Sequence, residues 1–127
     1  MPEPKLRDEA PPDDAVVVIR GGLHSLDLDR VRATAEDSVV DLGVYCVSVF
    51  AADDGDVRAL CQRLRRLQSP GVIWVARCGD LRRAGFALLA TDEAPHFDIV
   101  LPDLTVGTLE ALVWCFESRP NTLKEAP

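Results

Sequence analysis

The run of residues 44–51 constrains the fold most, because it reads Val-Tyr-Cys-Val-Ser-Val-Phe-Ala and is apolar almost throughout. A strand of this kind is covered on both of its faces, which is typical of a sheet packed between helices. Two shorter runs, residues 15–20 and 72–77, are also rich in β-branched and apolar side chains. The sequence therefore predicts three strands at the centre of an α/β domain.

Helical patterns fill the two intervals between these strands. The first helix follows Ser25, a candidate N-cap, and ends at Gly43, because glycine is the usual residue after a helix C-terminus. Its apolar positions recur at helical spacing: Leu28, Val31, Ala35 and Leu42. The second helix opens at Asp53 and Asp54 and stops at residues 69–71. Its apolar stripe is Val57, Leu60, Cys61, Leu64 and Leu67.

The remaining chain predicts a short helix over 79–85, strands over 86–91 and 97–101, and a helix from Asp103 or Thr105 to about Glu117. We expect the first three strands to be parallel, because each connection is long enough for a helical crossover. The next two links are too short for a crossover, so strands four and five should be antiparallel to their predecessors. The predicted fold is a single α/β domain, residues 15–118, with a mixed five-stranded sheet in the order β-α-β-α-β-β-β-α. Disordered acidic residues 1–14 and a flexible tail, 119–127, should flank it.

The cysteines and the N-terminus indicate the compartment. Cys46, Cys61, Cys78 and Cys115 are far apart, and no C-x-x-C pair suggests a zinc or redox site. They are expected to be buried thiols in a reducing, cytoplasmic environment. No run approaches the ~20 apolar residues that span a bilayer, and the acidic N-terminus is unlike a signal peptide. We expect no membrane association, metal or cofactor.

Charge is unevenly distributed along the chain. The net charge is −7, yet residues 57–83 carry seven arginines against Asp80 alone. An acidic protein gains no general attraction to a phosphate backbone, so nucleic acid is a disfavoured partner. Guanidinium groups suit carboxylates and phosphates, so the local patch predicts an acidic protein surface or an anion as ligand. The candidate binding residues are Arg58, Arg65, Arg66, Arg77, Arg82 and Arg83.

A parallel arrangement would also form a crevice at the carboxyl ends of the strands, where ligands bind in open α/β sheets. It would bring Arg20 and His24, the candidate catalytic residues, near Arg77 as an anion clamp. The alternatives are a tight turn at residues 21–22 and an exposed turn position for His24. His96 should lie at the opposite edge, and Ser48 is expected to be a satisfied core hydroxyl.

The order Arg20-Gly21-Gly22 and then Ser48-Val49-Phe50 resembles the first two motifs of ADP-ribosyltransferase-like toxins. In those proteins an arginine lies on an early strand and a serine on a later one. The glutamate of that family's late strand has no counterpart, since Glu110 and Glu117 fall in the predicted last helix. The chain also resembles small bacterial proteins of toxin–antitoxin gene pairs.

Two classes of function follow from these features. The favoured one is a small interaction or regulatory module that binds a protein partner through the arginine-rich helix face. The alternative, which the resemblance implies, is a toxin-like or effector enzyme acting on a nucleotide or RNA. The oligomeric state is left open by the sequence.

Overall fold

The computed structural model describes residues 11–19, 28–52, 57–64, 72–90 and 96–120, and its centre is a six-stranded sheet. The strands are β1 (Val16–Ile19), β2 (Tyr45–Ala52), β3 (Val72–Arg77), β4 (Ala87–Leu89), β5 (His96–Leu101) and β6 (Glu117–Pro120). They lie side by side in the order β4-β5-β2-β1-β3-β6. Every neighbouring pair is antiparallel.

This topology corrects the predicted parallel arrangement of the first three strands. β1 lies between β2 and β3 and is antiparallel to both, so Val16 is opposite Ala52 on one side and Arg77 on the other. A long connection permits a parallel crossover but does not require one. Here the connection after β1 returns the chain to the end of the sheet that it left, whereas the connection after β2 crosses the sheet, so that β3 runs parallel to β2 with β1 between them. The α/β class and the antiparallel pairing of β4 with β5 were predicted correctly, whereas the number and order of the strands and the direction of β1 relative to β2 and β3 were not.

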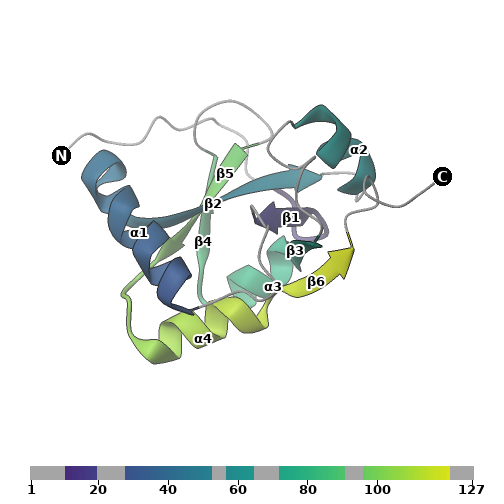
Figure 1. Ribbon diagram of the computed structural model, residues 1–127. Helices are drawn as coiled ribbons and strands as arrows, with labels where there is room; N and C mark the ends of the chain where they lie inside the picture. The colour runs from purple at the N-terminus through teal and green to yellow at the C-terminus, as the bar shows by residue number, and fades with distance from the viewer. Residues whose placement is uncertain (1–10, 20–27, 53–56, 65–71, 91–95, 121–127) are drawn as a thin grey trace.

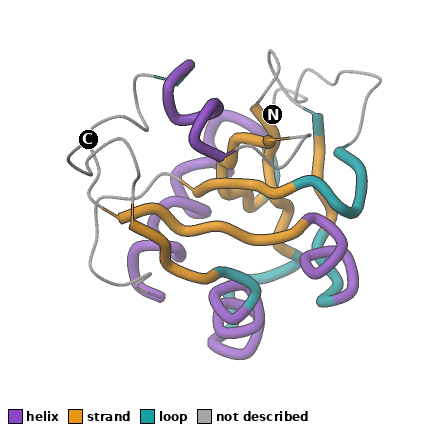
Figure 2. The backbone as a smooth tube through the Cα atoms, turned by 90° about the vertical axis from the view of Figure 1, so that its right-hand side faces the viewer, coloured by secondary structure: helices purple, strands orange, loops and turns teal. Residues whose placement is uncertain are grey.

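Within the described residues four helices cover the sheet: α1 (Leu28–Leu42), α2 (Val57–Arg63), α3 (Cys78–Arg83) and α4 (Val106–Trp114). Side chains of α1, α3 and α4 pack into the larger apolar cluster on one face, and side chains of α2 pack into a smaller cluster on the other. Figure 1 shows α1 and α4 together on one side of the strands, away from α2. The turned view in Figure 2 shows helices on both sides of the sheet.

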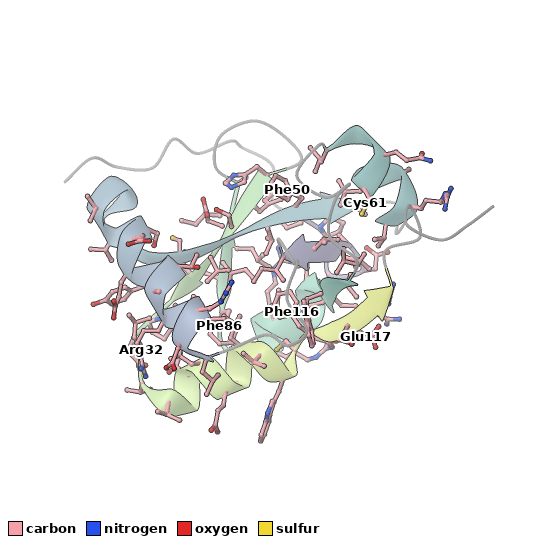
Figure 3. All side chains as sticks on the ribbon, in the orientation of Figure 1. Arg32, Phe50, Cys61, Phe86, Phe116 and Glu117 are labelled. Carbon is pink, nitrogen blue, oxygen red and sulfur yellow. The ribbon has the colours of Figure 1, made fainter. Side chains whose placement is uncertain are left out.

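Alternation along the strands explains the two clusters. Val47, Val49 and Ala51 belong to the cluster beneath α1 and α4, whereas Phe50 and Ala52 belong to the cluster beneath α2. The two-sided burial predicted from the apolar run is therefore confirmed. In Figure 3 Phe50 and Cys61 lie near α2, while Phe86 and Phe116 lie on the side of α3 and α4.

The predicted residues lie at the C-terminus of α1 and the N-terminus of α4. Gly43 has a φ of 75°, the left-handed conformation expected after a helix, and its N–H donates to the Val39 carbonyl at 3.0 Å. Thr105 is the N-cap of α4, and its hydroxyl accepts a hydrogen bond of 3.3 Å from the Thr108 N–H. α4 ends earlier than predicted, at Trp114, because the chain turns directly into β6.

Both ends of the described chain are tied to the sheet layer. The Gly79 N–H donates to the Asp13 carbonyl, and the Cys78 N–H donates to the Ala15 carbonyl, each at 2.9 Å. A Cβ at Gly79 would lie 3.1 Å from that Asp13 oxygen, so glycine permits the close approach. At the other end, Arg119 belongs to β6 rather than to a tail. No helix within the described ranges has the length and apolarity needed to cross a bilayer.

Candidate functional site

Four of the six arginines singled out in the sequence lie within the described residues, and these four are spread over α2, β3 and α3. Arg65 and Arg66 lie outside the described residues, as do Arg20 and His24. Arg58 on α2 and Arg77 at the end of β3 are exposed. Arg82 and Arg83 lie on α3, which packs into the larger apolar cluster, whereas α2 packs into the smaller cluster on the other face of the sheet.

Arg82 and Arg83 are engaged within the chain itself. Arg82 donates to the Asp13 carboxylate at 2.6 Å and to the Pro11 carbonyl at 2.5 Å. Arg83 forms an ion pair with Asp80, three residues earlier on the same helix. The contacts of Arg82 bind the segment before β1 to α3, whereas the ion pair of Arg83 lies within α3.

The antiparallel sheet also divides the crevice that a parallel sheet would have formed. β1 ends at Ile19, which is opposite Trp74, whereas Arg77 is opposite Val16 at the start of β1. The carboxyl ends of β1 and β3 therefore point to opposite edges of the sheet. Arg77 is separated from the end of β1 by the length of that strand, which removes the basis for its predicted role as a clamp beside Arg20.

The edge that carries Arg77 has a cleft of its own. Its volume is about 300 Å³, and it lies where β3 ends, α4 ends and β6 begins. In Figure 3 Glu117 marks the start of β6 beside it. The residues that line the cleft are Val16, Val75, Ala76, Arg77, Asp80, Trp114, Cys115, Phe116, Glu117 and Arg119.

Among the residues that the structure describes, the charges around this cleft are paired except at Arg77. Arg119 donates two hydrogen bonds to one carboxylate oxygen of Glu117, at 2.6 and 3.0 Å. Asp80 is paired with Arg83. The Arg77 guanidinium makes no hydrogen bond or ion pair with any residue in the described part of the chain. The cleft therefore has one cationic group that is available to a ligand.

Trp114 supplies the apolar part of the same site. It is the last residue of α4 and is 81% exposed, more than either of the other exposed large apolar residues, Val40 and Val106. Leu109 and Leu112 form the buried side of α4, and the position of Trp114 relative to them places its indole on the outer side. That spacing is visible in the sequence and was the signal that could have identified this residue.

A second polar group lies across β2 and β5, where Ser48 is opposite Asp98. The Ser48 hydroxyl donates to the Asp98 carboxyl at 3.1 Å, and Asp98 is only 2% exposed. His96 follows the same face, with its Nε2 atom 4.0 Å from the same carboxyl oxygen and its ring edge-on to Phe50. Ser48 is exposed rather than buried, and Asp98, the one buried charged residue of the described chain, was missed at the sequence level.

In this second group the serine is bonded to a carboxylate rather than to a histidine. In nucleophilic sites the nucleophile bonds to a base, which a third residue orients. Here the Ser48 hydroxyl bonds to Asp98, and the 4.0 Å separation between His96 and Asp98 exceeds hydrogen-bond length. Burial, and then the charge of Asp98, raise the pKa of the neighbouring Cys46 thiol to about 12. A thiol of that kind is a poor nucleophile at neutral pH.

The described residues hold no group of three or more His, Cys, Asp or Glu side chains suited to a metal ion.

The fold and the cleft define an α/β protein with an open antiparallel sheet and a mixed cationic and aromatic surface at one edge. Searches against protein-family models, curated proteins and solved structures find no match for this chain.

Proposed function

We propose that this protein is a small interaction module that binds an acidic segment of a protein partner in the cleft between Arg77 and Trp114. The observation that carries the proposal is the 81% exposure of Trp114 beside an arginine without an ion pair in the described chain. Tryptophan and arginine are the residue types that contribute most to binding at protein interfaces. An exposed indole in a cleft offers a partner apolar area that water solvates poorly.

The chemistry of the partner follows from the charges that line the cleft. Glu117 is paired with Arg119, and Asp80 is paired with Arg83, which lies on α3 outside the lining, so the charge of Arg77 has no partner within the described chain. A carboxylate of the partner can pair with this guanidinium, while an adjacent apolar side chain packs on the indole. The remainder of the acidic surface disfavours long polyanions, which supports a protein segment over nucleic acid.

Of the candidate binding arginines, the proposal uses Arg77 alone. Arg82 holds the segment before β1, and Arg83 holds Asp80, so neither guanidinium is free to meet a partner without losing a contact within the chain. Arg58 is exposed on α2 but does not line the cleft. Substitutions of Arg77 and Arg58 therefore distinguish two hypotheses. In the first the partner binds in the cleft, and in the second it binds on the exposed face of α2.

Fluorescence of Trp114 provides the test. The chain has two tryptophans, and Trp74→Phe leaves Trp114 as the reporter. This variant is titrated with a synthetic peptide of alternating Glu and Leu, and with matched peptides that carry Lys or Gln in place of Glu. We expect saturable binding of the Glu peptide alone, weakening as salt shortens the Debye length from about 8 Å to about 3 Å.

Two charge reversals locate the binding surface. Arg77→Glu should abolish the response to the Glu peptide, whereas the matched control Arg58→Glu should retain it. Thermal unfolding of both variants checks that the fold is intact, which we expect because both side chains are exposed. An equal response to the Glu and Lys peptides, or full binding by Arg77→Glu, would refute binding at the cleft.

A further inference from the structure

β6 forms one edge of the sheet in the described part of the chain. It is the outermost strand, pairs with β3 on one side and has no described strand on its other side. Glu117, Ser118 and Arg119 are all exposed. In an antiparallel strand every second residue directs its N–H and C=O groups away from its neighbour. The outer edge of β6 therefore presents backbone donors and acceptors to which another strand can bond.

The order of charges on this strand is self-complementary. The sequence Glu117-Ser118-Arg119, read against itself in the antiparallel direction, places each glutamate opposite an arginine when the two Ser118 residues are opposite each other. Moving the register by two residues places Glu117 opposite Glu117, or Arg119 opposite Arg119. Opposite charges across a strand pair are stabilising and like charges are destabilising, so the electrostatics select the register centred on Ser118.

The positions of these side chains suit that register. Glu117 is opposite Val75 and Arg119 is opposite Ile73, so both lie on the face that α2 covers farther along the sheet. They form an ion pair within one strand at 2.6 Å, and in the proposed register each charge also lies opposite the oppositely charged residue of the second copy. Ser118 lies on the other face, and its small side chain permits two chains to approach closely at the axis.

We propose that β6 pairs with β6 of a second copy of this chain, antiparallel and around a two-fold axis at Ser118, to give one sheet continuous across both chains. Such an interface is isologous, because each copy contributes the same residues. Strand pairing over four residues buries less than the ~1,600 Å² of a standard interface, so the dimer should be weak, with micromolar or higher dissociation constants. The proposal goes beyond the peptide-binding function; it shares Glu117 and Arg119 with the lining of the cleft but does not use Arg77.

Charge-reversal variants test the register directly. Sedimentation velocity is measured over a concentration series at ~0.15 M salt, where repulsion between the acidic chains is screened beyond ~8 Å. Wild type should show a monomer–dimer equilibrium. Glu117→Arg and Arg119→Glu should each weaken self-association by about tenfold or more, because two attractive pairs become two repulsive ones.

Two further samples distinguish a lost register from a damaged strand. An equimolar mixture of the Glu117→Arg and Arg119→Glu proteins should form a heterodimer, since all cross-strand pairs are again of opposite charge. The double variant Glu117→Arg/Arg119→Glu should dimerise as wild type does. Glu110→Arg, an exposed reversal on α4, should leave the dimer unchanged.

The outcomes that overturn the proposal are equally definite. A wild type that stays monomeric up to millimolar concentration, or a mixture that fails to associate, excludes this dimer. Self-association that none of these reversals affects would place the interface elsewhere. Arg77→Glu should dimerise normally while losing the Glu peptide, so failure of the dimer and failure of the peptide site are separate results.

Discussion

The Ser48 hydroxyl donates a 3.1 Å hydrogen bond to the Asp98 carboxyl and so joins β2 to β5 through their side chains as well as their backbones. Asp98 is buried on this face of the sheet, while Ser48 is exposed. Buried polar groups are tolerated where hydrogen bonds replace water. The exposed serine therefore contributes to satisfying a carboxyl that the fold has removed from solvent.

We expect Ser48→Ala to lower the free energy of unfolding by about 1–3 kcal/mol, because the buried carboxyl loses a donor. The measurement is urea denaturation at neutral pH. Thr34→Ala, an exposed substitution on α1, is the matched control and should change stability by no more than about 0.5 kcal/mol. Equal changes in the free energy of unfolding for the two substitutions would mean that the hydrogen bond of Ser48 makes no net contribution to stability.

Asp103 predicts a pH dependence of stability. Hydrogen bonds from the Thr108 and Thr105 hydroxyls, and from the Thr105 N–H, lower the pKa of this carboxyl below its usual 3.8. A group whose pKa is lower in the folded state stabilises the fold above the unfolded pKa, and loses that effect as pH falls through the folded pKa. Asp103→Asn should thus be less stable than wild type at neutral pH, and the difference should narrow in acid.

Thermal unfolding between pH 2 and 7 measures this difference. Thr108→Val removes the donor with the largest effect on the Asp103 pKa, so the same comparison in that background should show a smaller pH dependence. A gap between Asp103→Asn and wild type that stays constant down to pH 2 would contradict the assignment.

The cysteines should be unreactive in the folded protein. All four are free, and burial raises the pKa of Cys46 to about 12 and also raises the pKa values of Cys61 and Cys115. Because the thiolate is the reactive form, an alkylating reagent at pH 8 should modify these three thiols slowly, and all four rapidly in denaturant. Mass spectrometry identifies the modified sites. Rapid labelling of Cys46 in native protein would disprove its burial.

Two glycines form a matched pair for backbone effects. Gly85 has a φ of 97°, a conformation that side-chain-bearing residues rarely adopt, although a Cβ there would meet no atom within 4 Å. Gly107 lies in α4, and a Cβ there would also meet nothing within 4 Å. Gly85→Ala should lower the free energy of unfolding by about 1–3 kcal/mol. Gly107→Ala should raise it by up to about 1 kcal/mol, since alanine favours helix.

Denaturation midpoints of the two variants give the comparison. Both substitutions add a methyl group where no atom lies within 4 Å, so neither changes the packing. Changes of opposite sign in the free energy of unfolding would therefore report the backbone conformation at each glycine. If Gly85→Ala were as stable as wild type, the positive φ at this turn would not be a requirement of the fold.

The outcome for Arg77 shows why the candidate site could not be placed from the sequence. The residue was identified as a candidate because it ends an apolar strand within the basic segment, and it does line a cleft. Its neighbours there are Trp114, Glu117 and Arg119, which follow it by some forty residues. No local pattern indicates that α4 ends beside β3, because that contact depends on how the whole layer packs.

Features that depend on neighbouring residues were predicted correctly from the sequence. The apolar run of β2 required cover on both faces, Gly43 ended α1, and Thr105 began α4, because each depends on alternation or on hydrogen bonds within a few residues. Tertiary structure alone decided that β1 is antiparallel to both β2 and β3 and that Glu117 opens a sixth strand. Strand direction and order are set by which apolar faces meet across the sheet, and connections long enough for a helix allow either direction.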